Sequence, residues 1–473
     1  MSFIGKAVSW LRDVLGLTRS IQDQFGVTVA ISPLMSAKQA EWRNIVAGQA
    51  EWNNKDTPSL LLADAVSQEI ASRAALGLKS EITGSARANY LNEQYMPVID
   101  DLQNAVVAIA NGGEAIYRLN LTDDGIETTL VETDAYWPIG YNAKNELIDV
   151  IFGAIYQTDK WTYRLLERHT FDSEAQTHAI IYRAFRAESS SNAFTPDSLG
   201  TPANLSDVPD WAALEDITIT GIEKPLFVLV KAPINAIIEK PQRQGVPVWI
   251  KAVDMFRKAD LHEARMEWEM EGGELAVQAA DVLFRRIDNG GEKRLNLPKG
   301  KERLYQTFDN APETMPINIY NPEPRIDAYN KRMNDILRRI EFSCGLSYGI
   351  ISDNEAQIQT ATEFRSSKER LVTTISGMQL DVLQPALEHL IESFGILADL
   401  QGIPAGTVNT TFEWSESYAI DRREEVEERL KLLGMGILFP DEVRAYYNEI
   451  PLDQAQQEMQ ERGLPLEVVE DEF

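Results

Sequence analysis

Residues Ser352 to Phe394 read SDNEAQIQTATEFRSSKERLVTTISGMQLDVLQPALEHLIESF. The first eight are mostly polar, so we predict a loop there. Thr360 and Glu363 follow at the spacing of a capping box, in which each side chain accepts a backbone N–H at the start of a helix. Apolar residues then recur every three or four positions, which predicts a long helix with one buried face. Pro385 is expected to bend this helix, because proline lacks an N–H and crowds the preceding turn.

A strand-rich segment between two predicted helices precedes this loop. The first helix is predicted over 247–271, where a Gly-Gly pair ends it. Strands separated by glycine-containing turns are predicted over 275–320. The second helix is predicted over 324–344, because its apolar residues recur at helical spacing: Ile326, Tyr329, Met333, Ile336, Leu337 and Ile340.

The remaining sequence predicts helices at both ends and strands between them. Residues 1–112 carry helical periodicity, whereas 114–187 are rich in Ile, Val, Tyr and Thr with turn residues between the runs. The Ser- and Pro-rich stretch 188–212 is predicted to be a loop or strand connection. Two short helices and a tail are predicted over 412–473. The fold class is therefore predicted to be α+β.

Composition limits the class of protein. The 473 residues suffice for two to four domains, and no run of about 18 apolar residues predicts a transmembrane helix. The first 17 residues are predicted to form an amphipathic helix, for which packing or docking is favoured over attachment to a membrane surface. Cys344, the single cysteine, lies between apolar neighbours and is predicted to be a small buried residue.

No motif in the sequence carries catalytic chemistry. A P-loop, a dinucleotide fingerprint and an H-E-x-x-H pattern are all missing. His262 stands among glutamates in LHEARMEWEME, but an exposed charged helix has the same composition, and a second histidine at i+3 or i+4 is missing. We therefore expect no enzyme activity, no catalytic residues, no metal and no cofactor.

The charge distribution leaves two interpretations open. A formal net charge of −28 argues against a protein that grips nucleic acid, since such binding requires clustered Lys and Arg. It suits either a surface past which DNA slides or plain solubility. Segment 274–322 has equal numbers of acidic and basic residues. Its basic residues belong either to a solvated hairpin or to a contact surface for an acidic partner or DNA phosphate. They are Arg285, Arg286, Lys293, Arg294, Lys299, Lys301 and Arg303.

The loop, the T-A-T-E stretch at 360–363 and the acidic, leucine-rich helix after it resemble the portal proteins of tailed bacteriophages, in particular their minor capsid branch. AVVAIANGGEAIYRLNL at 105–121 resembles that family's step from helix to strand, and DAYWPIGYN at 134–142 resembles the loop that follows. The resemblance implies a portal architecture with these parts: an α/β wing (1–246), a stem helix (247–273), a clip (274–322), a second stem helix (323–346), a tunnel loop with a long kinked wing helix (347–411) and a helical crown (412–473).

The same resemblance implies a function. Portal proteins form rings of about twelve subunits at one capsid vertex, through which double-stranded DNA is packaged and ejected. The implied partners are further copies of the chain, the terminase large subunit, the head–tail adaptor, the major capsid protein and a scaffold protein, without a membrane. The implied location is the virion, after assembly in the host bacterial cytoplasm.

The resemblance also assigns roles to residues. The tunnel loop that lines the DNA channel would comprise Ser352, Asp353, Asn354, Glu355, Gln357 and Gln359, and Thr360 with Glu363 would cap the helix behind it. Exposed positions on the stem helices are expected to face the channel: Glu263, Glu267, Glu271, Lys331, Arg338 and Arg339. The clip contacts would be the seven basic residues of segment 274–322.

Two alternatives remain at this stage. The chain could be another head–tail connector or capsid component, although adaptors are usually much smaller. It could instead be a metal-dependent nuclease whose fold gathers scattered carboxylates, which metal-dependent cleavage of plasmid DNA would reveal.

Overall fold

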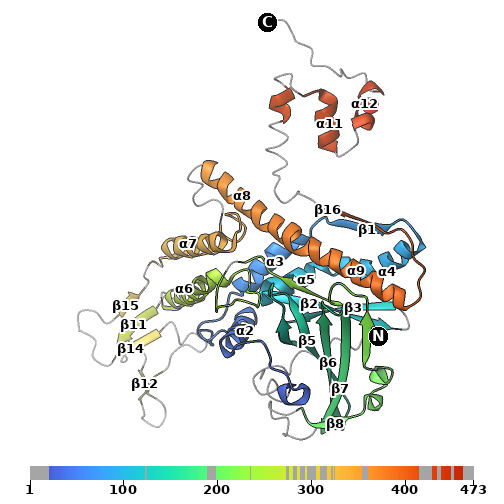
Figure 1. Ribbon diagram of the computed structural model, residues 1–473. Coiled ribbons are helices and arrows are strands. Elements are labelled where there is room, and N and C mark those ends of the chain that lie inside the picture. Colours follow the sequence, from blue (N-terminus) through green and yellow to red (C-terminus); the bar gives the residue numbers. More distant parts are fainter. Residues whose placement is uncertain are drawn as a thin grey trace.

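The computed structural model of the chain contains a mixed helix-and-sheet body with a two-helix stalk (Figure 1). It describes the following residues: 21–122, 125–188, 199–234, 236–272, 276–280, 285–287, 293–295, 305–308, 317–320, 323, 325–353, 361–414, 429–433, 438–448 and 452–461. The predicted α+β class agrees with this mixture of helices and largely antiparallel sheets.

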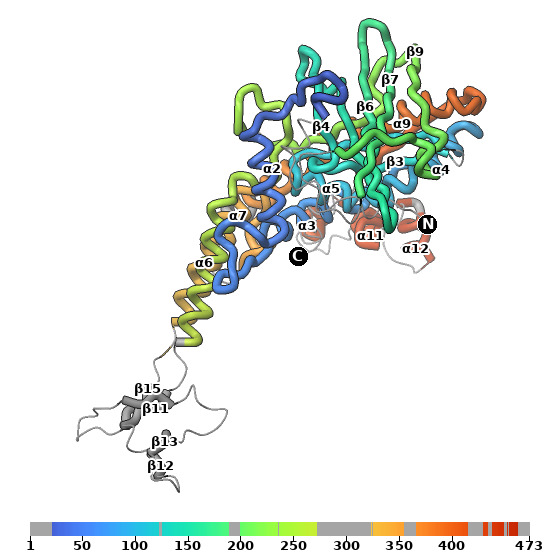
Figure 2. The backbone as a smooth tube through the Cα atoms, turned by 90° about the horizontal axis from the view of Figure 1, so that it is seen from below, coloured from blue at the N-terminus to red at the C-terminus, as the bar shows by residue number. Residues whose placement is uncertain are grey.

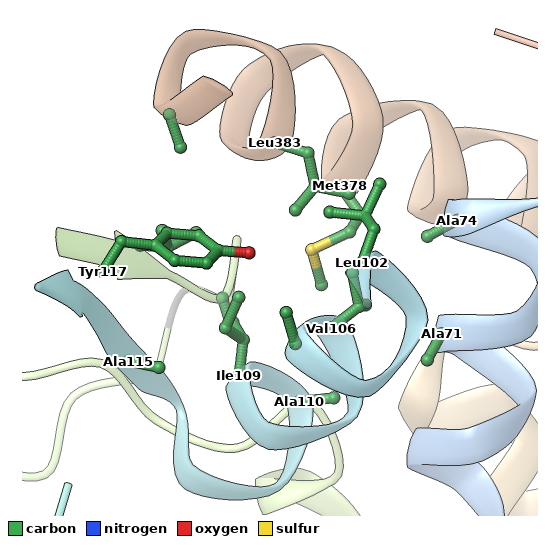
Figure 3. Close-up of a cluster of buried hydrophobic side chains, with 14 of the residues drawn as sticks. Ala71, Ala74, Leu102, Val106, Ile109, Ala110, Ala115, Tyr117, Met378 and Leu383 are labelled. Carbon is green, nitrogen blue, oxygen red and sulfur yellow. The ribbon is translucent and has the colours of Figure 1, made fainter. Parts of the chain in front are cut away.

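The first part of the body is helical, as predicted. It contains α2 (Pro33–Val46), α3 (Leu62–Ala75), α4 (Ala86–Asp100) and α5 (Leu102–Gly112). Helix α5 carries Leu102, Val106 and Ile109 on one face, and all three are buried. Figure 3 shows this face between α3 and the long helix over residues 361–400, where Met378 and Leu383 meet it. The main hydrophobic core therefore joins segments far apart in sequence.

Two antiparallel sheets follow, as the pattern over 114–187 predicted. The smaller has the order β10-β2-β3, and the larger has the order β4-β5-β6-β7-β8, with β9 also paired to β7. Their bounds are β2 (Glu114–Thr122), β3 (Gly125–Glu132), β4 (Tyr136–Tyr141), β5 (Leu147–Gln157), β6 (Trp161–Asp172), β7 (Thr177–Glu188), β8 (Thr201–Ala203), β9 (Ile217–Thr220) and β10 (Phe227–Lys231). The 3-10 turns η3 (Leu205–Asp207) and η4 (Pro209–Trp211) lie between β8 and β9.

A glycine contact fixes the point where the chain leaves these sheets for the stalk. Gly113 ends α5 with φ +85°, and a Cβ there would lie 2.5 Å from the backbone of Val246. Next to it, the buried carboxylate of Glu114 accepts the Gly245 N–H at 2.7 Å. A side chain at position 113 would force the two backbones apart, so glycine is required there.

One strand in the N-terminal region was not predicted. β1 (Lys79–Thr83) pairs antiparallel with β16 (Asn409–Glu413), with Lys79 opposite Glu413 and Thr83 opposite Asn409. The expectation that 1–112 is purely helical is therefore wrong at this strand. β16 spans the expected boundary at 411/412.

The long helix is present but differs from the expected kinked helix. It consists of α8 (Ala361–Ser376), a π-helical segment η8 (Gly377–Leu383) and α9 (Gln384–Leu400). Pro385 lies in the first turn of α9, directly after the π-helical turns, where the Gln384 N–H bonds the Gln379 carbonyl five residues back. Figure 1 shows one continuous rod across this position. The predicted irregularity is thus a change in hydrogen-bond register rather than a sharp bend.

The segment between the stalk helices contains short strands, as predicted. β11 (Ala276–Ala280) pairs parallel with β14 (Tyr305–Phe308) and antiparallel with β15 (Ile317–Tyr320), while β12 (Arg285–Ile287) pairs with β13 (Lys293–Leu295). Near the C-terminus, α11 (Pro440–Asn448) packs against α12 (Leu452–Glu461). Of these two, the sequence indicated only the helix beginning at Pro440.

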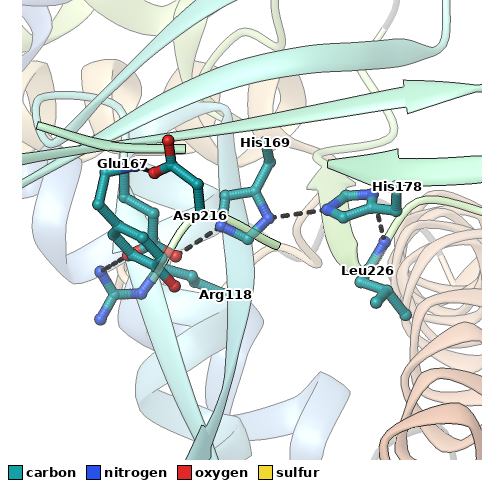
Figure 4. Close-up of polar contacts among 7 residues, drawn as sticks. Arg118, Glu167, His169, His178, Asp216 and Leu226 are labelled. Carbon is teal, nitrogen blue, oxygen red and sulfur yellow. Dashed lines mark hydrogen bonds and ion pairs between the residues drawn. The ribbon is translucent and has the colours of Figure 1, made fainter. Parts of the chain in front are cut away.

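A buried chain of polar groups connects the larger sheet to the smaller one (Figure 4). The Leu226 N–H donates to Nδ1 of His178, and Nε2 of His178 lies 2.9 Å from Nδ1 of His169. His169 bonds Glu167 through its other nitrogen, and Glu167 accepts a bond from Arg118 at 3.2 Å. When both histidines are neutral, each one accepts a hydrogen bond at Nδ1 and donates one from Nε2. His178 then donates to His169, and His169 donates to Glu167, so every group has a partner.

This chain predicts that acid destabilises the fold. Burial, with a smaller contribution from His169, lowers the pKa of His178 to about 2. Unfolded histidine takes up a proton near pH 6.5, so the unfolded state binds more protons as the pH falls below about 6.5. We expect urea unfolding at pH 5.5 to give a free energy about 1.4 kcal/mol lower than at pH 7.5 from this residue.

The matched variant for this measurement is His178→Gln. A glutamine amide can accept from Leu226 and donate to His169, but it does not titrate. The drop in the free energy of unfolding between pH 7.5 and 5.5 should therefore be smaller in His178→Gln than in the native chain. Equal drops in the two proteins would rule out His178 as the source.

Glu167 affects the stability of the fold only at lower pH. Burial opposes its charged form, but Arg118 and His169 outweigh burial and keep the pKa of Glu167 below the usual range.

Candidate functional site

The most distinctive feature is the stalk formed by α6 (Val253–Gly272) and α7 (Ile326–Cys344), which lie side by side and extend away from the body (Figure 2). The helices are antiparallel. Nε2 of His262 donates to the carbonyl of Tyr329 at 2.9 Å, and nearer the far end Arg325 donates to both carboxylate oxygens of Glu269 at 2.8 and 2.7 Å. Both helices predicted around the strand-rich segment are confirmed.

Apolar residues fix the inner end of the stalk in the body core. On α6, Phe256 and Ala259 are buried, and on α7 the buried residues are Ile336, Ile340 and Cys344. Burial raises the pKa of the Cys344 thiol to about 12, which keeps it protonated at neutral pH. The prediction that Cys344 is a small buried residue is confirmed.

A buried carboxylate attaches α6 to the loop before α3. Asp260 is 3% exposed, and its Oδ2 accepts from Trp52 Nε1 at 2.8 Å and from Asn53 Nδ2 at 2.9 Å. Its Oδ1 accepts the Leu60 N–H at 2.9 Å. Three donors therefore converge on one side chain, and they fix the position of the stalk on the body.

A second buried carboxylate anchors the segment after α7. Glu341 is fully buried, and its Oε1 accepts the backbone N–H groups of Ile351 and Ser352 at 2.8 and 2.9 Å. Its Oε2 accepts the Ser352 hydroxyl at 2.7 Å. The side chain of Asn334 bonds both the N–H and the carbonyl of Asp353. The chain is thus tied to α7 up to residue 353.

Arginine side chains and aromatic rings connect α7 to α8 beside this anchor. The guanidinium carbons of Arg338 and Arg370 lie 4.7 and 5.4 Å from the centre of the Tyr348 ring. Arg370 also lies 4.5 Å from the centre of the Phe342 ring and donates to the Leu346 carbonyl. These stacking contacts connect the middle of α8 to the inner end of the stalk.

The structure places the six expected stem residues on two separate edges. Glu267 and Glu271 on α6 are exposed, and Glu263 is half-buried. On α7, Lys331 and Arg339 are exposed, whereas Arg338 is half-buried against Tyr348. The acidic and basic residues therefore belong to different helices of the stalk, as expected from the sequence.

The expected loop and clip residues are described only in part. Ser352 is 8% exposed and bonded to Glu341, so it belongs to the anchor and is not an exposed lining residue; Asp353 is exposed. Five expected loop and cap residues lie outside the described residues: Asn354, Glu355, Gln357, Gln359 and Thr360. Glu363 lies in helix α8. Arg286 is opposite Arg294 in the register of strands β12 and β13, which also contain Arg285 and Lys293. Three expected clip contacts lie outside the described residues: Lys299, Lys301 and Arg303.

Sequence reasoning missed the residues that fix the site, namely Asp260, Glu341 and Asn334. A signal was present for two of them. Asp260 stands four residues after the buried Phe256, and Glu341 stands four after Leu337 and three before the buried Cys344. A charged residue at a position that helical spacing assigns to the buried face indicates a polar contact in the core.

In the part of the chain that the structure describes, there is no group of three or more His, Cys, Asp or Glu side chains that could hold a metal ion. None of the helices described is both long and apolar enough to cross a membrane.

Comparisons with known proteins give limited information. No protein-family model matches the chain, and no curated protein matches it. Among solved structures, the chain is similar to one described as the neck of a native GTA particle computed with C12 symmetry. The similarity covers 92% of this chain and 99% of that chain, with 11% identity and a TM-score of 0.42. Since this TM-score is low, the proposed function rests on the chain's own geometry.

Proposed function

We propose that this chain is the repeating subunit of a ring-shaped DNA conduit, of the portal kind found at the capsid vertex of tailed bacteriophages. The observation that supports this most is the antiparallel two-helix stalk. It is fixed in a mixed helix-and-sheet body at one end, leads into a strand-containing segment at the other, and has a loop anchored at its base.

Such a stalk is suited to form the wall of a tube. Helix α6 has 20 residues and is about 30 Å long, which is an upper bound on the depth of the channel that a ring of stalks would enclose. Each subunit would contribute one helix pair, and the body would form the wider part of the ring. The segment over 276–320 would dock the terminase large subunit during packaging and the head–tail adaptor afterwards.

The charge of the chain supports passive conduction of double-stranded DNA. About twelve copies at −28 each would carry on the order of −340 formal charges, which repel phosphate and reduce adhesion. In this proposal the subunit is not an enzyme, and ATP hydrolysis belongs to the motor that docks on it. Residues 354–359, between the Glu341 anchor and α8, would face the DNA in the mature virion.

We expect the purified chain to form rings with a central hole, close to twelve subunits each. Negative-stain imaging and native mass spectrometry over a range of protein and salt concentrations test this expectation. Monomers and dimers under every condition would contradict the proposal. Plasmid DNA incubated with the protein and Mg²⁺ should remain intact, whereas metal-dependent cleavage would favour the nuclease alternative.

A further inference from the structure

The stalk has one acidic and one basic edge, on opposite sides of the helix pair. On α6, His262 and Glu269 contact α7, and Glu267 and Glu271 each stand two residues from Glu269. Two residues correspond to about 200° around a helix, so both glutamates lie on the side away from α7. We call this side the acidic edge.

The same geometry applies to α7. Lys331 stands two residues after Tyr329, whose carbonyl accepts the bond from His262. Arg338 stands midway between Ile336 and Ile340, both of which are buried. Lys331 and Arg338 therefore lie on the side away from α6, and so does the exposed Asp327, which stands two residues before Tyr329, so this edge carries two basic groups and one acidic group. This basic edge and the acidic edge cannot meet within one subunit, because the helix pair separates them.

We propose that the acidic edge of one subunit binds the basic edge of the next copy, so that Glu267 pairs with Lys331 of the neighbouring subunit. The occupant is a second copy of this chain, because each copy carries both halves of the complementary surface. Such a heterologous interface closes into a ring when the rotation between subunits permits it. The inference rests on the proposed ring and specifies the surface that assembles it; it gives Glu267 and Lys331 a role between subunits in place of the channel-facing role that the resemblance implied.

The positions along the stalk add a geometric requirement. Because Tyr329 lies beside His262 and the helices are antiparallel, Lys331 is level with about residue 260 of α6. Glu267 lies seven residues farther from the body, or about 10 Å. The long Lys and Glu side chains can span part of this difference in height, and an inclination of the stalks to the ring axis would supply the rest.

Charge reversal tests the interface. Both Glu267 and Lys331 are exposed, so Glu267→Lys should leave the melting temperature of the subunit nearly unchanged. Lys331 stands four residues from both Asp327 and Asp335, so Lys331→Glu should lower the free energy of unfolding by at most about 1 kcal/mol. Each variant places like charges across every interface and should weaken it about five- to tenfold at low salt. The double variant should recover ring yield. Glu174→Lys, at the exposed β6–β7 turn, controls for the change in net charge.

A mixture of the two single variants separates an interface between subunits from a contact within one. Glu267→Lys carries lysine at both positions, and Lys331→Glu carries glutamate at both. If the contact crosses subunits, a ring in which the two variants alternate places a lysine opposite a glutamate at every interface. Mixed rings should then form where neither variant assembles alone. The deficits should also shrink at high salt, because salt screens exposed charges.

Two outcomes would overturn the inference, and a third concerns the proposed function. If the single variants assemble like the native chain at low salt, or if mixing gives no recovery, the inference is wrong. If the native chain itself forms no rings, the proposed function fails instead.

Discussion

Replacing Asp260 with alanine is expected to lower the free energy of unfolding by about 3 kcal/mol or more. The change removes the acceptor for Trp52, Asn53 and the Leu60 N–H, and it leaves three donors without a partner in a position that is 3% exposed in the native chain. Each buried donor left unsatisfied costs about 1–3 kcal/mol, and partial hydration of the two side chains keeps the total near the lower end. Urea unfolding followed by tryptophan fluorescence measures the loss.

Two variants sharpen this prediction. Asp260→Asn keeps the shape of the side chain but replaces one of the two acceptor oxygens with an N–H₂ group, which cannot accept from these donors. We therefore expect a loss in the free energy of unfolding of about two-thirds of that in Asp260→Ala. Asp254→Ala removes an exposed carboxylate from the first turn of the same helix and should cost at most about 1 kcal/mol. Similar losses in Asp260→Ala and Asp254→Ala would mean that Asp260 does not fix the stalk to the body.

Replacing Glu341 with alanine is expected to release the anchored segment while α7 stays folded. The Ile351 N–H, the Ser352 N–H and the Ser352 hydroxyl lose their shared acceptor. Because this segment lies at the end of a helix and can move toward water, much of the effect should be local opening. Hydrogen exchange of residues 349–353 should become at least about tenfold faster, with a global loss of about 2 kcal/mol.

The conservative variant Glu341→Gln distinguishes the anchor from simple packing. Its amide oxygen can still accept both backbone N–H groups, and its N–H₂ can donate to the Ser352 hydroxyl oxygen. Exchange over 349–353 should therefore stay close to that of the native chain. Equal acceleration in the glutamine and alanine variants would contradict the anchoring role of the carboxylate oxygens.

The stalk helices and the long helix could be predicted because their information is local. Ile336 and Ile340 are buried on the face that helical spacing assigns, and Gly345 ends α7 in a left-handed conformation. Strands β2 to β7 were also predictable, since runs of β-branched and aromatic residues alternate with turn residues. These elements needed no knowledge of distant partners.

The features that were missed depend on distant partners. The five residues of β1 are stabilised by β16, about 330 positions away, so no local pattern announced a strand. Asp260 bonds the Leu60 N–H across 200 positions. Tertiary contacts decided both of these features.

The antiparallel stalk has a consequence for how such a chain can diversify. The strand-containing segment leaves the stalk after α6 and returns just before Arg325, whose guanidinium lies 2.7 Å from Glu269 near the end of α6. An insertion whose two ends are adjacent can be lengthened, shortened or exchanged without moving the rest of the fold. Specificity for a docking partner could therefore change by transplanting one module, while the residues that fix the stalk to the body remain as they are.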